Sequence, residues 1–164
     1  FFKSKNRKVS YDTLSNYLGY IEEAFLAYKT ERYNIKGKDV VAGNCKYYLN
    51  DLSFKNFLYP GFAYGVGYLL ENAVYLELRR LGYIVYTGSF RDKEVDFVAM
   101  KDDRVIYLQA TYMLETAQTM EREYAPLLTI GDNYEKYVVS MDEVQFPSNE
   151  GVRHIQAWNL KEIL

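Results

Sequence analysis

Cysteine and histidine are almost absent from this sequence of 164 residues, which contains one of each. Cys45 has no partner within the chain for a disulfide, which fits a protein of the reducing cytoplasm. One cysteine and one histidine also exclude a zinc site built from His and Cys side chains of this chain. No run of about 18 apolar residues occurs and no secretory signal is visible. We therefore expect a cytoplasmic protein without a membrane partner.

A surplus of positive charge is absent as well. The sequence has 20 Lys and Arg against 22 Asp and Glu, a net charge of −2, which argues against a generally basic nucleic-acid-binding protein and leaves only a local patch open. The length suits one domain, or one domain with an appendage. The chain begins with Phe1 and not with methionine, so we expect a fragment of a longer protein.

Residues 9–50 are predicted to begin with an amphipathic helix. Ser10 or Asp12 can cap it, because both side chains accept hydrogen bonds from the free N–H groups of a first turn. Its apolar residues recur at spacings of three, four and seven, which is typical of a helix with one buried face. These residues are Leu14, Tyr17, Leu18, Ile21 and Phe25.

A two-stranded hairpin is predicted to follow, from residues 24–33 and 45–49. A helix followed by a lysine-bearing hairpin is the back half of a winged helix, so we assign residues 1–57 to a partial winged-helix region with a linker. Lys36 and Lys38 at the hairpin tip are candidate DNA-binding residues, since they could meet phosphates. A solvated turn is the alternative, and it has the greater weight because the net charge is negative.

The longest helical pattern covers residues 62–81, and Glu71 lies beside its apolar side. A carboxylate is costly to bury there without a partner. Glu71 is therefore an active-site acid, a salt-bridged core acid or an edge residue in contact with solvent. The apolar side consists of Val66, Leu70, Val74, Leu78 and Leu81.

The order of elements from residue 62 onward is predicted as α-β-β-β-α-β with a small tail. The strands cover residues 83–87, two segments within 94–112, and residues 137–140; the second helix covers residues 115–128. This order is typical of one α/β domain around a central sheet.

The segment Glu94–Tyr112 reads EVDFVAMKDDRVIYLQATY. It is predicted to form two short strands joined by a charged turn, because its residues alternate between the two faces of a strand, with polar residues among the apolar ones. Strict alternation places Glu94, Asp96 and Val98 on one face and Val95, Phe97 and Ala99 on the other. Gln109 and Thr111 share a face of the next strand. We expect Asp96, Gln109 and Thr111 to be neighbours on the face towards Glu71.

These residues carry a family resemblance. The element order, Glu71 in the first helix, the strand Glu94–Phe97 and the group Gln109–Thr111 resemble the PD-(D/E)xK, restriction-endonuclease-like fold. Three segments resemble, more closely, the C-terminal domain of unknown function of prokaryotic AAA-type ATPases. They are Lys46–Asp51, Leu70–Leu78 and Glu94–Phe97. The resemblance implies a nuclease-like domain at residues 58–164, with a P-loop ATPase upstream in the longer protein.

The resemblance also implies where the catalytic groups of a nuclease would lie. Asp96 matches the first acid, Gln109 the second acid, Thr111 the lysine and Glu71 the helix acid of some members. In such nucleases the acids hold Mg²⁺, here Asp96 and Glu71, and the metal activates water. A neutral Gln109 brings no charge to a dication, and Thr111 supplies no cationic donor.

The leading hypothesis is therefore a regulatory or interaction module without a cofactor, bound to its own ATPase segment or to other subunits. The first alternative is a Mg²⁺-dependent DNA nuclease that uses Glu71, Asp96 and Gln109. The second is a winged-helix module that binds DNA. Since such ATPases tend to assemble, the resemblance leaves two alternatives open for this chain, an oligomer and a monomer.

Overall fold

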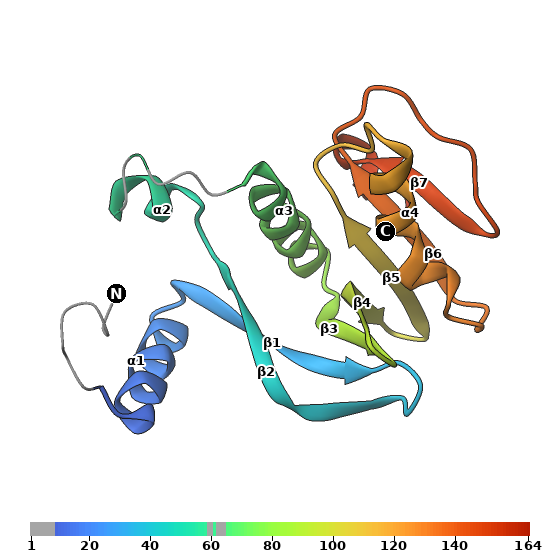
Figure 1. Ribbon diagram of the computed structural model, residues 1–164. Coiled ribbons are helices and arrows are strands. Elements are labelled where there is room, and N and C mark those ends of the chain that lie inside the picture. The colour runs from blue at the N-terminus through green and yellow to red at the C-terminus, as the bar shows by residue number, and fades with distance from the viewer. Residues whose placement is uncertain (1–8, 59–60, 62–64) are drawn as a thin grey trace.

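The computed structural model describes residues 9–58, 61 and 65–164. They form a mixed α/β fold with a seven-stranded sheet (Figure 1). The helices are α1 (Tyr11–Glu23), α2 (Ser53–Leu58), α3 (Val66–Arg80), α4 (Ala117–Leu128) and the 3-10 helix η1 (Ala157–Glu162). The strands are β1 (Ala27–Asn34), β2 (Asp39–Leu49), β3 (Ile84–Phe90), β4 (Lys93–Lys101), β5 (Arg104–Ala110), β6 (Glu135–Ser140) and β7 (Val152–Gln156).

The sheet has the strand order β2-β1-β3-β4-β5-β6-β7 and contains both parallel and antiparallel strand pairs. The strands β3, β4 and β5 form an antiparallel meander, and β6 and β7 continue it in parallel. The hairpin of β1 and β2 is joined to this sheet because β1 pairs in parallel with β3. The sheet is thus continuous across the expected boundary between residues 1–57 and 58–164, and the division into two domains stays a prediction.

The predicted order α-β-β-β-α-β is present as α3-β3-β4-β5-α4-β6. The predicted start of the long helix at residues 62–64 lies outside the described residues. Ser10 caps α1 as expected, accepting a hydrogen bond of 3.1 Å from the N–H of Thr13. The linker expected at the end of residues 1–57 contains most of the short helix α2 (Ser53–Leu58).

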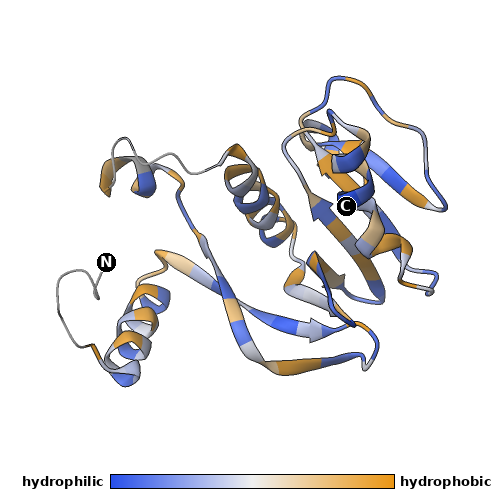
Figure 2. Ribbon diagram, in the orientation of Figure 1, coloured by the Kyte–Doolittle hydropathy of each residue, from blue (hydrophilic) through white to orange (hydrophobic). Residues whose placement is uncertain are grey.

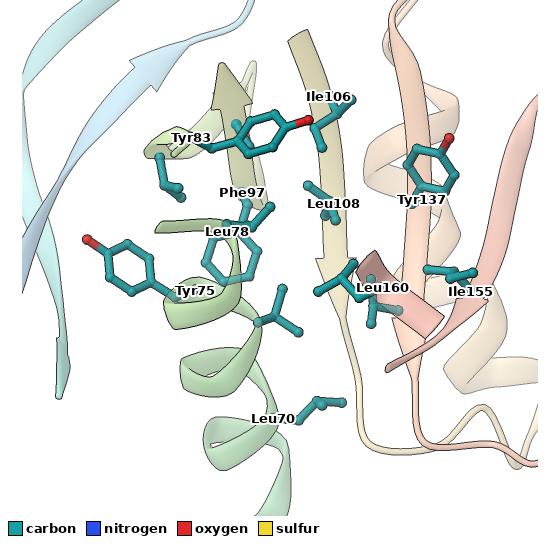
Figure 3. Packing of buried hydrophobic residues seen from close by; sticks show 14 of the residues in the cluster. Leu70, Tyr75, Leu78, Tyr83, Phe97, Ile106, Leu108, Tyr137, Ile155 and Leu160 are labelled. Carbon is teal, nitrogen blue, oxygen red and sulfur yellow. The ribbon is translucent and has the colours of Figure 1, made fainter. Parts of the chain in front are cut away.

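One hydrophobic core lies between α3 and the sheet (Figure 3). Of the apolar stripe predicted for α3, Leu70, Val74 and Leu78 are buried in this core and Leu81 packs against it. Val66, at the start of the helix, is exposed, so that end of the predicted stripe is wrong. The main contributors are Leu70, Val74, Tyr75, Leu78, Val85, Phe97, Ile106, Leu108, Tyr137, Ile155 and Leu160. Burial of this apolar area is the main source of stability for the layer.

A second core lies on the opposite face, beneath α4. Thr116 caps that helix by accepting a hydrogen bond of 3.1 Å from the N–H of Thr119. The main contributors to this core are Ile35, Val95, Val98, Tyr107, Leu114, Tyr124, Leu127, Val138 and Val152. The central strands are therefore covered on both faces, which explains why their sequences are almost continuously apolar.

A β-bulge interrupts the alternation of β4. Tyr86 pairs with Val98 while Gly88 pairs with Val95, so that Thr87 opposes two residues of β4. The expectation that Val98 lies opposite to Val95 is wrong for this reason: both belong to the core beneath α4. Gly88 permits the close approach, because a Cβ atom there would lie 2.8 Å from Cγ2 of Val98.

Helix α1 differs from the other long helices because none of its residues is buried. Hydrophobic and hydrophilic residues stripe both α1 and α3 (Figure 2), yet only α3 buries its stripe against the sheet. No helix within the described ranges is long and apolar enough to cross a membrane.

Candidate functional site

Lys46 of strand β2 lies at the centre of a group of acidic side chains. Its Nζ atom is 3.0 Å from Oε1 of Glu71 and 2.9 Å from Oε1 of Glu94. Oδ1 of Asp96 lies 3.7 Å away. We call these four residues the Lys46 cluster. It joins an edge strand of the sheet to α3 and to β4.

Two further side chains complete the hydrogen bonding of the Lys46 cluster. The hydroxyl of Tyr48 donates to Oε1 of Glu71 at 2.7 Å, and its ring stacks on Tyr75 with centroids 4.2 Å apart. Arg32 of β1 pairs with Oε2 of Glu94. Three carboxylates thus face two cations and one phenol. These six side chains have a formal charge of −1 when the carboxylates, Lys46 and Arg32 are charged and the phenol is neutral.

The electrostatics of the site keep Lys46 charged and Tyr48 protonated. Burial lowers the pKa of Lys46, but Glu71 and Asp96 outweigh it, so the net shift is upward. Burial and the neighbouring Glu71 carboxylate raise the pKa of Tyr48. Both side chains therefore act as hydrogen-bond donors towards Glu71 at neutral pH.

Asp96 is held where β4 and β5 separate. Its Oδ2 accepts a hydrogen bond of 2.9 Å from the N–H of Ala110, while Oε1 of Gln109 accepts one of 3.3 Å from the N–H of Asp96. Burial and the Glu71 carboxylate raise the pKa of Asp96 from 3.8 to about 7, against the lowering effects of Ala110 and Lys46. Regular pairing of β4 with β5 ends at Phe97 and Leu108. Beyond that pair, the side chains of Asp96 and Gln109 accept the main-chain N–H groups that the opposite strand would otherwise bind.

The structure brings together most of the predicted site residues. Glu71 and Asp96 meet through Lys46, and Gln109 contacts Asp96 through the main-chain N–H. The expectation that Gln109 shares the Glu71 face is wrong. Leu108 belongs to the α3 core, so strand alternation turns Gln109 towards α4. Thr111 is buried just after β5, where its N–H donates to Val139, outside the hydrogen bonds of the Lys46 cluster.

Lys46 is the residue that sequence reasoning missed. A weak signal was present, because Lys46 and Tyr48 alternate on one face of a predicted strand and both reach Glu71. Glu94 joins the cluster on the predicted strand face of Asp96. Lys93 and Lys101 do not join it: they donate to main-chain oxygens of Ala125 and Leu81.

The candidate DNA-binding residues lie at the tip of the β1–β2 hairpin. Lys36 is exposed, and its N–H donates to Oδ1 of Asn34. Nζ of Lys38 lies 5.9 Å from the ring centroid of Tyr134, in the loop that precedes β6. Lys38 therefore contacts the body of the domain, and a role of these lysines in binding DNA stays a prediction.

The donor set does not suit Mg²⁺ in this arrangement. The ammonium group of Lys46 lies between the carboxylates that a dication would bridge, and repulsion would oppose a second cation there. Within residues 9–58, 61 and 65–164, no group of three His, Cys, Asp or Glu side chains is placed to hold a metal ion. The arrangement can form ion pairs and hold a proton on Asp96.

Ser140, Asp142 and His154 form a second polar network, which is buried. The N–H of Phe146 donates to Nδ1 of His154 at 3.1 Å, so Nε2 carries the proton towards Ser140 at 2.8 Å. The Ser140 hydroxyl donates to Oδ2 of Asp142 at 2.7 Å. His154 thus cannot take a proton from Ser140, and the network ties the loop after β6 to β7.

Two curated relatives are similar to the chain. An uncharacterized protein of Haemophilus influenzae is 36% identical over 137 residues, which cover 84% of this chain and 34% of that protein. The uncharacterized protein MJ1544 of Methanocaldococcus jannaschii is 32% identical over 125 residues, which cover 74% of this chain and 27% of that protein. The chain thus spans about a third of the first relative's length and about a quarter of the second's. No family model matches the chain, and no solved structure gives a significant match.

Replacement of Lys46 by methionine is expected to destabilise the fold. Three carboxylates would remain with only Arg32 as a cation, and breaking a buried ion pair costs ~3–5 kcal/mol. About a third of the Lys46 side chain is accessible, so we expect on the order of 2 kcal/mol in urea unfolding. The control Lys36→Met removes an exposed lysine from the hairpin tip. The cluster is not a source of stability if Lys46→Met and Lys36→Met have the same free energy of unfolding. The same conclusion follows if the double variant Lys46→Met/Glu71→Gln is no more stable than Lys46→Met alone.

The Asp96→Asn variant is expected to change the dependence of stability on pH. A folded-state pKa raised from 3.8 to about 7 means that the folded protein binds a proton more tightly than the unfolded chain. Asp96 therefore favours folding below pH 4, and this advantage is lost as the pH rises to 7. Relative to Asp96→Asn, the wild type should lose on the order of 4 kcal/mol between pH 4 and pH 8.

Urea unfolding at both pH values measures this difference. Asp102→Asn, which removes a carboxylate from an exposed turn, is the matched control. A wild type that gains stability relative to Asp96→Asn over the same interval would contradict the assigned direction.

Proposed function

We propose that the chain is an interaction and regulatory module of a longer AAA-type ATPase, with a restriction-endonuclease-like fold and no hydrolytic activity of its own. The position of Lys46 is the observation that carries this proposal. The carboxylates of Glu71, Glu94 and Asp96 form ion pairs with Lys46 within the protein, in place of bonds to a metal ion. The neutral residues Gln109 and Thr111 leave the nuclease pattern incomplete.

The arrangement of elements supports the fold assignment within this proposal. The order α3-β3-β4-β5-α4-β6 places Glu71 on the first helix and Asp96 and Gln109 on adjacent strands. This agrees with the resemblance to the PD-(D/E)xK fold at the level of element order and acid position. The segment Lys46–Leu49 and the segment Glu71–Asn72, both taken from the resemblance, contact each other directly.

The curated relatives support a role within a longer protein. About two thirds or more of each relative lies outside the part that matches this chain. We place the ATPase in that other part and expect the module to bind it, or another subunit of an oligomer, in the cytoplasm. An ion-paired site is suited to this role because it fixes the hairpin rigidly and needs no ligand.

Separate expression of the two parts of the Haemophilus influenzae relative tests this proposal. The matched region, added to the remaining part, is expected to bind it and to change its rate of ATP hydrolysis at least twofold. Size-exclusion chromatography and a phosphate-release assay measure the two effects. Absence of both ATP hydrolysis and binding would overturn the proposal; bovine serum albumin at the same concentration is the control.

A metal-dependent nuclease is the second candidate. Convergence of three carboxylates and a lysine on one site favours it, since a lysine on β2 offers a positive charge that Thr111 does not supply. In this case the Lys46 cluster would hold the catalytic groups, with Asp96 and Glu71 as the acids.

A plasmid-nicking assay with Mn²⁺ or Mg²⁺ separates the two candidates. We expect no cleavage above the buffer control and no calorimetric signal for metal binding. The Asp96→Ala and Lys46→Met variants serve as matched controls for contaminating nucleases. Metal-dependent cleavage by the wild type that both variants lose would establish a nuclease and overturn the proposal that the chain has no hydrolytic activity.

A further inference from the structure

Helix α1 has an apolar face that stays partly exposed. Leu14, Leu18 and Ile21 recur at spacings of four and three, so they lie on one side of the helix, and we call them the α1 face. Leu18 and Ile21 are each 36% exposed, whereas Leu78 of α3 is fully buried. Figure 1 shows α1 beside the β1–β2 hairpin, apart from α3 and α4. A helix of this length is marginal in water unless packing covers its apolar side, so the α1 face is suited to docking.

Phe25, which follows the last turn of α1, is exposed in a strained backbone conformation. The N–H of Leu26 donates to the C=O of Ile21 at 3.0 Å, which closes the helix with Phe25 at a φ of 55°. This position favours glycine, because a bulky side chain is unfavourable in the left-handed region. Phe25 is nevertheless 69% exposed and gains little from packing within the chain. Contact of its ring with a partner accounts for an aromatic residue there.

The charges of α1 argue against a second copy of the chain as that partner. Residues 9–28 contain Asp12, Glu22 and Glu23 but no lysine or arginine, so two such helices would repel each other. Glu22 and Glu23 lie in the last turn, which has no basic residue, and a carboxylate there is unfavourable for the helix dipole. Glu23 is exposed and has no ion pair within the part of the chain that the structure describes. An apolar partner surface with a lysine or arginine beside Glu23 suits this helix.

We propose that the α1 face and Phe25 form the surface by which this chain docks on the part of the longer protein outside it. About two thirds or more of each curated relative lies outside the matched region, so polypeptide that can cover α1 belongs to the same protein. A partner in the same protein is present at a high effective concentration, and a small apolar surface then suffices for docking. The inference rests on the proposed function, because it takes the partner from the longer protein.

Hydrogen–deuterium exchange of α1 tests the inference. The amides of Tyr11–Glu23 should exchange about tenfold more slowly in the longer protein that carries this chain than in the isolated chain, because docking suppresses local opening of the helix. The 3-10 helix η1 lies outside the docking surface and is the internal control. Protection of another segment in place of α1 would overturn the inference and leave the proposed function standing. Absence of protection from every segment would overturn both.

The Phe25→Gly variant separates docking from stability. Glycine adopts a φ of 55° without strain, so the urea midpoint of the isolated chain should stay unchanged or rise. In the longer protein the lost aromatic contact should make α1 exchange about tenfold faster than without the substitution. Asp102→Gly is the matched control, since Asp102 has a φ of 52° in a turn outside α1.

Two results with Phe25→Gly would contradict the assignment of this residue. A lower urea midpoint of the isolated chain would give Phe25 a role in packing within the chain. Equal exchange of α1 in the longer proteins that carry Phe25→Gly and Asp102→Gly would show that the ring contacts no partner.

The Glu23→Lys variant tests the charge of the partner. In the isolated chain a lysine in the last turn favours the helix, so exchange of α1 should not become faster. In the longer protein exchange should become about threefold faster at low ionic strength, and salt should reduce this difference. Glu162→Lys, an exposed change in η1, is the control. Unchanged or slower exchange of α1 in the longer protein with Glu23→Lys would overturn the cationic partner surface.

Sedimentation equilibrium of the isolated chain tests the second copy as an occupant of the α1 face. A monomer is expected, because the acidic side chains of two α1 helices repel each other. A dimer that Phe25→Gly dissociates, and that Asp102→Gly leaves intact, would assign the α1 face to a second copy and overturn the inference.

Discussion

The positive charge of Lys46 is the constraint on which the site depends. Three carboxylates from α3 and β4 converge there, and burial of such groups is unfavourable unless a cation compensates them. Because Lys46 belongs to the edge strand β2, its ion pairs also fix the hairpin against the helix and the central sheet. Loss of this one charge therefore affects the position of a strand as well as the protonation of Asp96.

Three successive residues of helix α3 have three different roles. Leu70 packs into the core, Glu71 accepts from Lys46 and Tyr48, and Asn72 binds the main chain of Leu49. A helix turns by about 100° per residue, so these neighbours reach both the core face of the sheet and its edge strand β2. The two segments that meet here, Lys46–Leu49 and Leu70–Asn72, are far apart in the sequence but act as one unit.

Local patterns predicted much of the fold because they depend on neighbouring residues. The cap at Ser10, the apolar stripe of α3 and the order α-β-β-β-α-β follow from side-chain chemistry and periodicity. The bulge in β4 was not predictable in this way, since it depends on the pairing of β4 with β3, where Gly88 allows Val95 and Val98 to approach closely. Likewise, the joining of Lys46 to Glu71 depends on the register of β2, which no local pattern specifies. The acids of the site were therefore found from the sequence, whereas the cation was not.

The identity of residue 111 connects this electrostatic arrangement to function. The resemblance implies that a nuclease needs a cation at the position of Thr111, just after β5, in addition to a metal between the acids. Here the positive charge comes from β2 and lies between the acids themselves. A dication could enter only after Lys46 had left, and its departure would remove the ion pairs that hold the hairpin. Stability and metal-dependent catalysis thus compete for the same carboxylates, and the bonds around Lys46 favour stability.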